Sequence, residues 1–289
     1  MNNFGAILKK IRENRNFTQR GVANGIVSPS QLCEFENGER DIKLSKFYCI
    51  LEKIGVTFEE FIHIANDYEF SGFQRILHKV LELYIAGNEK ALKKFLLDEE
   101  AREVSEEDIY HELNCLMIKA AIGEIDKDFV LSQKEKNRIS DYLVSIYDWA
   151  YYELILYTNV MRALDTSVIR QLSETVLSCT KFYREIPRNK NLMITIMLNT
   201  MIVFTDRKEL DYAIEFKQAA ERLLGESDIF ERTMFLFISG VIDFYKGKLK
   251  EGKEKMEDAV AIFSKVGSLE LARDYQQNYD EIVNSLEEK

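Results

Sequence analysis

Residues 17–39 constrain the fold more than any other stretch, because they predict two short helices joined by a tight turn. Thr18 is a candidate cap for the first helix, since its hydroxyl can accept a hydrogen bond from a free backbone N–H. Gly25 permits the turn. Ser28 can cap the second helix, and Pro29 then stands at its first position, where a missing N–H costs nothing. Such a pair is typical of proteins that place the second helix in the major groove of DNA.

The second helix of this pair has an apolar and a polar face. Leu32 and Phe35 are three residues apart and share one face. Ser30, Gln31 and Glu34 point away from that apolar face. We therefore expect a helix that is anchored from behind and presents polar side chains at its start.

The stretch resembles the Xre-type helix-turn-helix, which combines Leu-Lys-x-x-Arg, Thr-Gln and Ser-x-Ser-x-Ile/Leu-x-x-x-Glu-x-Gly. The matching residues are Leu8, Lys9, Arg12, Thr18, Gln19, Ser28, Ser30, Leu32, Glu36 and Gly38. Apolar residues at helical spacing predict a helix before this stretch and two after it. The resemblance implies a five-helix DNA-binding domain over residues 1–65, with Arg12 and Glu36 as a buried structural pair.

The polar residues of this domain supply the candidate DNA contacts. Gln19, Ser30 and Gln31 are the base-edge candidates, because a glutamine can make a bidentate contact with adenine worth roughly 1–3 kcal/mol of discrimination. The alternative is that they touch only phosphate. The full predicted set is Lys9, Arg15, Thr18, Gln19, Arg20, Ser28, Ser30, Gln31 and Lys43. Glu34 and Asn37 depart from the resemblance, since basic residues are common at those two positions.

The net charge of −10 is unevenly distributed. Residues 1–65 hold nine Lys and Arg against eight Asp and Glu, whereas the remainder holds 30 against 41. An acidic body repels DNA, so contact should be confined to the N-terminal domain. One such domain binds weakly, and a dimer that reads two half-sites is the usual remedy.

Composition bounds the remaining possibilities. A chain of 289 residues with only 2 Pro and 13 Gly favours two mostly helical domains. It has no apolar run of roughly 18 residues and no signal-peptide core, so we expect a cytoplasmic protein without a membrane segment. The cysteines, at positions 33, 49, 115 and 179, are scattered, which favours reduced structural thiols. Cys33 and Cys49 are the two candidates for a redox effect.

Residues 73–289 follow a predicted linker at 66–72 and repeat a simple unit. A polar turn, an acidic residue and a small residue recur after apolar helices, at residues 87–91, 208–213 and 248–252. Phe204 and Phe244 are 40 residues apart, as are the turns after them. This period predicts a right-handed, tetratricopeptide-like helical repeat, in which stacked helix pairs form the core and leave a concave face.

This domain order resembles the Rgg/GadR/MutR regulators of Gram-positive bacteria. Two segments carry the likeness, namely residues 28–39 and residues 247–275. The resemblance implies a homodimeric transcription factor that binds promoter DNA and is controlled by a short hydrophobic peptide in quorum sensing. RNA polymerase is a further candidate partner.

Three polar residues recur with the repeat on apolar helices. Asn159, Asn199 and Ser239 are separated by 40 and 40 residues. A buried amide needs partners, and a peptide backbone can satisfy a carboxamide, as such residues do in the wider peptide-binding group. The alternative is an interhelical hydrogen bond. Arg162 could hold a peptide carboxylate, or pair at the surface with Asp165 or Glu153.

No pattern of enzyme chemistry appears. The histidines have no metal-ligand spacing, and phosphate-loop and hydrolase motifs are missing, so we expect no catalytic site, metal or cofactor. The sequence predicts an all-α, two-domain regulator. Three alternatives stay open, namely a regulator of this family that responds to a metabolite or redox state instead of a peptide, an adaptor without DNA affinity, and an unrecognised enzyme.

Overall fold

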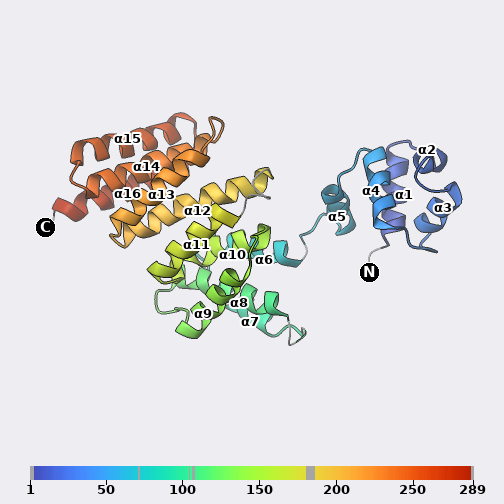
Figure 1. Ribbon diagram of the computed structural model, residues 1–289, viewed down its shortest axis with the longest axis horizontal. Coiled ribbons are helices and arrows are strands. Elements are labelled where there is room, and N and C mark those ends of the chain that lie inside the picture. The colour runs from blue at the N-terminus through green and yellow to red at the C-terminus, as the bar shows by residue number, and fades with distance from the viewer. Residues whose placement is uncertain (1–2, 71, 104, 106–107, 180–185, 288–289) are drawn as a thin grey trace. The chain divides into compact units, whose positions relative to one another are not determined.

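The computed structural model describes residues 3–70, 72–103, 105, 108–179 and 186–287, and all regular elements in these ranges are helices. The chain divides into two compact units, residues 1–82 and 83–289. Helix α6 (Gly72–Ile85) runs across their boundary, and the predicted linker at 66–72 ends at its first residue. Figure 1 colours the helices in chain order, from blue at the N-terminus to red at the C-terminus.

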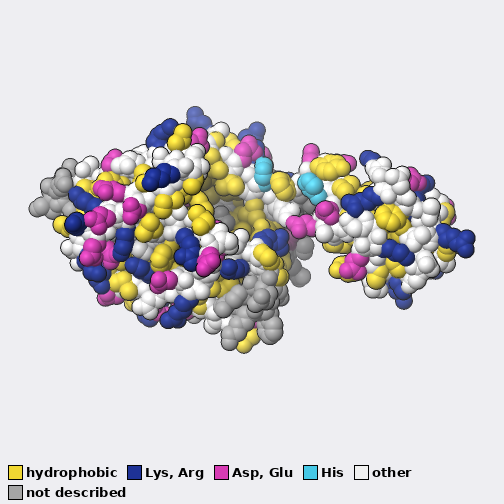
Figure 2. All heavy atoms as spheres, turned by 90° about the horizontal axis from the view of Figure 1, so that it is seen from above, with side chains coloured by type: hydrophobic (Ala, Val, Ile, Leu, Met, Phe, Trp, Pro, Cys, Tyr) yellow, Lys and Arg dark blue, Asp and Glu magenta, His cyan; other side chains and the backbone are white. Residues whose placement is uncertain are grey.

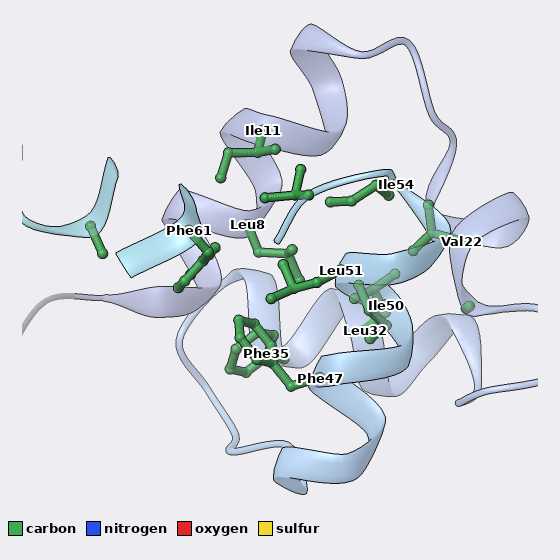
Figure 3. Packing of buried hydrophobic residues seen from close by; sticks show 13 residues of the cluster. Leu8, Ile11, Val22, Leu32, Phe35, Phe47, Ile50, Leu51, Ile54 and Phe61 are labelled. Atoms are coloured by element: carbon green, nitrogen blue, oxygen red, sulfur yellow. The ribbon is translucent and has the colours of Figure 1, made fainter. Parts of the chain in front are cut away.

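The first unit contains the five predicted short helices. They are α1 (Phe4–Asn14), α2 (Gln19–Ala23), α3 (Pro29–Glu36), α4 (Leu44–Lys53) and α5 (Phe58–Ala65). Their apolar faces meet in one core, which Figure 3 shows from close by. Leu8, Leu32 and Ile50 are wholly buried there, and Phe47 packs edge-on against Phe61 at 4.9 Å between ring centroids. This core fixes where α3 presents its polar face.

The caps of α2 and α3 follow the sequence pattern. The Thr18 hydroxyl accepts a hydrogen bond from the Gly21 N–H at 3.0 Å, and the Ser28 hydroxyl accepts one from the Gln31 N–H at 3.1 Å. Pro29 occupies the first position of α3. Gly25 has a positive φ of 79°, which a residue with a Cβ rarely adopts. Each of these local features sets the direction in which α3 leaves the turn.

The second unit is built from longer helices. They are α7 (Glu89–Glu100), α8 (Ile109–Ile125), α9 (Gln133–Ser145), α10 (Tyr151–Val160), the short 3₁₀ helix η1 (Met161–Ala163), α11 (Thr166–Cys179), α12 (Pro187–Asp206), α13 (Leu210–Leu223), α14 (Ile229–Tyr245), α15 (Leu249–Lys265) and α16 (Leu269–Glu287).

These helices pack in two rows. Helices α8, α10, α12 and α14 contact one another in sequence and form one row. Helices α9, α11, α13 and α15 each pack against a neighbour in that row. A row of inner helices with a partner beside each is the arrangement of helical-repeat proteins. The prediction of an all-α chain with a helix-turn-helix domain followed by helical repeats is confirmed.

Helices α14 and α15 show why a small residue follows the turn before α15. A Cβ on Gly240 in α14 would lie 2.7 Å from the carbonyl oxygen of Gly252 in α15, and the reverse also holds. The two backbones therefore touch with no room for a side chain. The preceding turns carry residues with positive φ, namely Gly87, Lys208 and Gly247. Only Lys208 among these three has a side chain.

Three further observations concern the interior, the membrane and metal binding. Trp149 is wholly buried, its indole N–H donates to the Leu143 carbonyl at 3.0 Å, and it packs against Tyr157, so its role is packing. Within the ranges that the structure describes, no helix is both long enough and apolar enough to cross a bilayer. In the same ranges, no group of three or more His, Cys, Asp or Glu side chains could hold a metal ion.

Candidate nucleic-acid interface and repeat-unit cavities

The start of α3 presents exposed polar side chains. Ser28, Ser30 and Gln31 are all exposed, whereas Leu32 and Phe35 on the other face are buried in the core. The Gln31 carboxamide oxygen accepts a long hydrogen bond of 3.5 Å from the Ser28 N–H. Because a contact of that length is weak, the carboxamide can turn outward at low cost. The geometry suits a helix whose first turn enters a groove.

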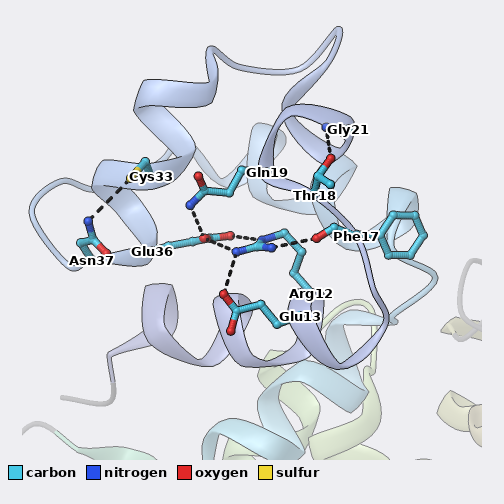
Figure 4. Close-up of polar contacts among 9 residues, drawn as sticks. All are labelled: Arg12, Glu13, Phe17, Thr18, Gln19, Gly21, Cys33, Glu36 and Asn37. Atoms are coloured by element: carbon cyan, nitrogen blue, oxygen red, sulfur yellow. Dashed lines mark hydrogen bonds and ion pairs between the residues drawn. The ribbon is translucent and has the colours of Figure 1, made fainter.

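Behind this face lies a buried ion pair, drawn in Figure 4. The Arg12 guanidinium donates to both carboxylate oxygens of Glu36, from Nε at 2.6 Å and from Nη2 at 2.8 Å. Its Nη1 donates to the Phe17 carbonyl at 2.8 Å. The Glu36 hydrogen bonds and charge raise the pKa of Arg12 above its ordinary value, although burial acts in the opposite direction. The pair therefore locks α1 to the end of α3 and the loop before α2.

Two predicted DNA contacts are engaged within the protein. The Gln19 carboxamide N–H donates to Glu36 Oε2 at 2.7 Å, so Gln19 joins the buried network. Arg15 Nη1 donates to the carbonyls of Ile54 and Gly55 at 2.8 and 2.7 Å. Arg15 thus caps the end of α4, although its side chain remains exposed. Sequence reasoning missed both internal roles, because each partner is distant along the chain.

The remaining predicted cations differ in exposure. Arg20 and Lys43 are exposed, and Lys9 is half-buried. Lys43 precedes α4, which receives no side-chain cap. Thr18 caps α2 and is exposed.

The two positions that depart from the Xre pattern also have partners. Glu34 Oε2 lies 3.4 Å from Arg40 Nη1, in a pair whose arginine side chain is 60% exposed and whose glutamate side chain is 40% exposed. The Asn37 carboxamide donates to Cys33 Sγ at 3.7 Å and to Glu39 Oε1 at 3.5 Å. A negative side chain therefore stands on the polar face of α3 beside a compensating arginine.

The three residues with a 40-residue period lie on α10, α12 and α14, but their surroundings differ. Asn159 is exposed, and its amide donates to the Ile155 carbonyl of its own helix at 2.8 Å. Asn199 is half-buried. Ser239 is buried, and its hydroxyl has no hydrogen-bond partner in the described part of the chain. The expectation that Asn159 is a buried amide is wrong, because it lies in the last turn of α10, next to solvent.

Arg162 does not form either ion pair expected from the sequence. In η1, its Nη1 lies 3.1 Å from Asp206 Oδ2, and its Nε lies 3.8 Å from Glu124 Oε2. Asp206 is at the end of α12, so the partner comes from the next inner helix and not from Asp165 or Glu153. Arg207 holds η1 in place by donating to the Arg162 and Leu164 carbonyls at 3.0 and 2.8 Å.

The Arg162 side chain borders two cavities. One, the apolar cavity of about 330 Å³, lies among α12, α14 and α16, and its apolar side chains are accompanied by Thr205, Asn278, Glu281 and the Arg162–Asp206 pair. The apolar lining residues are Ile202, Phe237, Ile238, Val241, Tyr275 and Ile282. The other, of about 610 Å³, is lined by charged side chains that include Lys127, Lys136 and Arg207. Neither is lined by Asn159, Asn199 or Ser239. The sequence did not predict the apolar cavity, because its walls come from three helices that are far apart in the chain.

The surface of the repeat unit has no single-sign patch on the face that Figure 2 shows. Lys and Arg side chains are intermingled there with Asp and Glu.

The cysteine thiols differ in exposure. Cys49 is exposed and Cys33 half-buried, whereas burial raises the pKa of the buried Cys115 thiol to about 11. Cys115 therefore stays protonated at neutral pH and is a poor nucleophile.

Comparisons with known proteins agree with this architecture. Residues 8–61 match the helix-turn-helix family, and residues 94–277 match the family described as the C-terminal domain of the HTH-type transcriptional regulator Rgg. The crystal structure of the Streptococcus dysgalactiae SHP pheromone receptor Rgg2 is 26% identical, with a TM-score of 0.81. The alignment covers 96% of this chain and 99% of that one.

Two more distant structures share the fold. A Listeria monocytogenes EGD-e protein assigned as a transcriptional regulator is 20% identical over 99% of this chain and 98% of its own, with a TM-score of 0.84. The PrgX/cCF10 complex is 15% identical over 98% of this chain and 93% of its own, with a TM-score of 0.71. The family match spans more than half of the chain and includes most of its repeat unit. This protein therefore belongs to the Rgg family of helix-turn-helix transcriptional regulators.

Proposed function

We propose that the chain is a sequence-specific DNA-binding regulator whose repeat unit binds a short hydrophobic peptide. One observation carries the proposal: both units align, over 96% of the chain, with Rgg2, a protein described as an SHP pheromone receptor. Promoter DNA is the partner of the first unit. A second copy of the chain and RNA polymerase complete the proposed assembly.

The DNA readout is assigned to the exposed start of α3. Gln31 and Ser30 are free to face base edges, and the buried Arg12–Glu36 pair holds the helix from behind. Arg20 and Lys43 are exposed and available for phosphate contacts. Each such contact should add about one unit to the slope of log binding constant against log salt concentration. The acidic balance of residues 66–289 keeps DNA away from the rest of the molecule. A homodimer would read two half-sites and multiply the affinity of one weak contact surface.

The peptide is assigned to the inner helices α10, α12, α14 and the adjoining α16. The apolar cavity of about 330 Å³ is large enough for a bulky apolar side chain, and the half-buried Asn199 can pair with peptide N–H and C=O groups. Ser239 remains a predicted contact, with a hydroxyl that has no partner among the described residues but is buried in this structure. Arg162 would exchange its exposed contact with Asp206 for a peptide carboxylate.

A regulator that uses no peptide is the alternative. A redox signal would act through Cys49, which is exposed, rather than through Cys115, whose thiol burial keeps protonated. A metabolite would use the smaller or the charged cavity beside Arg162.

The test titrates the full-length protein onto fluorescently labelled promoter fragments, with and without short hydrophobic peptides. Gln31→Ala should lose roughly 1–3 kcal/mol of discrimination at one base position. Lys43→Ala should instead reduce the affinity for all DNA sequences by the same factor. A peptide should shift the affinity for the preferred fragment. Protein that prefers one fragment but ignores every peptide, and responds to an oxidant instead, would favour the alternative.

A further inference from the structure

The polar face of α3 has a carboxylate at its centre. With 3.6 residues per turn, Ser30, Glu34 and Asn37 form one stripe along the helix. The buried residues of α3 are Leu32, Phe35 and Glu36, which lie on the opposite side. If α3 enters a major groove with its free face, Glu34 therefore cannot avoid the groove.

A carboxylate in that place is selective as well as repulsive. The major-groove edges of guanine and thymine present acceptors, N7 with O6 and O4, that a carboxylate cannot pair with. Cytosine presents the N4 amino group, which donates to a carboxylate, whereas adenine places its N6 amino group beside the N7 acceptor and so suits a carboxamide better. Glu34 thus favours cytosine at the position it faces and disfavours guanine and thymine there.

The chain after α3 is folded so that an arginine offsets this charge. The Gly38 N–H donates to the Phe35 carbonyl at 2.9 Å, and the Glu39 N–H donates to the Glu34 carbonyl at 2.8 Å. Gly38 has a φ of 75°, so the backbone turns back along the helix. This turn brings Arg40 Nη1 to 3.4 Å from Glu34 Oε2.

The geometry leaves half of the carboxylate available. Arg40 occupies Oε2, whereas Oε1 accepts no hydrogen bond from any residue that the structure describes. The two side chains are 40% and 60% exposed, so the pair can meet DNA without rearranging the core. Arg40 also reduces the repulsion between the carboxylate and the phosphates.

We propose that Glu34 is a specificity-determining residue that selects cytosine in each half-site, and that Arg40 is the positioning residue that holds its carboxylate. This assignment rests on the proposed DNA-binding function and deepens it.

The experiment selects bound duplexes from a pool randomised across the binding site, using the full chain. Wild-type protein should retain cytosine at one position per half-site. Glu34→Gln keeps the side-chain shape but can pair with adenine, so the cytosine preference should fall by roughly 5- to 100-fold and move toward adenine. Glu39→Gln, which removes a neighbouring exposed carboxylate, should leave the base preference unchanged. Equal melting curves would show that the variants are folded.

Arg40→Gln supplies the second reading. In the wild-type background it should weaken the preference for cytosine. In the Glu34→Gln background it should not change the base preference, because Arg40 affects base choice only by holding the Glu34 carboxylate. If Glu34→Gln strengthened binding to all sequences equally and kept the same preferred base, Glu34 would be merely repulsive and the assignment would be overturned. Wild-type protein without any sequence preference would instead overturn the proposed function, and this assignment with it.

Discussion

The two units differ in how closely the sequence pattern determines the surroundings of their polar residues. In the first unit, three features between residues 12 and 36 fix the helix-turn-helix: the Thr18 cap of α2, the capping box of α3 and the buried Arg12–Glu36 ion pair. In the second, residues with a strict 40-residue period occupy three different environments, exposed at Asn159, half-buried at Asn199 and buried at Ser239. A local motif specifies geometry, whereas a long period specifies only which helix a residue belongs to.

The largest expected effect lies in the first unit. Glu36→Ala would leave Arg12 buried without its partner, at a cost of about 3–5 kcal/mol of folding free energy. Glu34→Ala, which removes an exposed carboxylate from the same helix, should cost less than about 1 kcal/mol. Because the chain's single Trp, Trp149, lies in the second unit, circular dichroism should show an early transition that Trp fluorescence does not. Equal losses for both variants would contradict a special role for the buried pair.

The second unit should be sensitive where its backbones touch. Gly240→Ala places a Cβ against the Gly252 carbonyl and Met256, which should cost about 1–3 kcal/mol despite the better helix propensity of alanine. Gly252→Ala should cost a similar amount. The double variant should cost less than the sum, because helices already forced apart can accept the second methyl group. Denaturant unfolding followed by Trp149 fluorescence measures all three, and strict additivity would argue against a shared contact.

Asn199→Ala should separate the two possible roles of that amide. If a peptide is its partner, peptide affinity should fall by roughly 1–3 kcal/mol with little change in melting temperature. Asn159→Ala is the matched control for stability, since its amide bonds only to its own exposed helix end. Thermal melts and peptide titrations decide the matter. A variant that melts early and still binds peptide normally would remove Asn199 from the proposed site.

The smallest expected change concerns the turns of the repeats. Gly247 has a φ of 85° and open space around it, so Gly247→Ala should cost about 1–2 kcal/mol through backbone strain alone. Lys250→Ala, at a 90% exposed side chain on the next helix, should change stability by less than about 0.5 kcal/mol. Chemical unfolding of the two variants side by side provides the comparison. Identical midpoints would show that this turn tolerates a side chain as Lys208 does in its own turn.

The sequence predicted the fold well, because short-range signals dominate it. Ser28, Pro29 and Gln31 specify the start of α3 within four residues, and the periodic turns indicate the repeats. It predicted partners poorly wherever they are far along the chain. Arg162 pairs with Asp206 on α12, and Arg15 caps α4, which no spacing indicates. The apolar cavity depends on Tyr275 and Ile282 of α16 meeting α12 and α14, a tertiary arrangement without a local signature.

If peptide binding to the repeat unit controls DNA binding by the first unit, the two ligands must be thermodynamically linked. The operator affinity of full-length protein is measured with and without a bound hydrophobic peptide, and the peptide affinity with and without operator. Each ligand should change the affinity for the other by the same factor, roughly 5- to 150-fold, since the coupling free energy is reciprocal. Peptide and operator that bind tightly but leave each other's affinity unchanged would contradict this linkage.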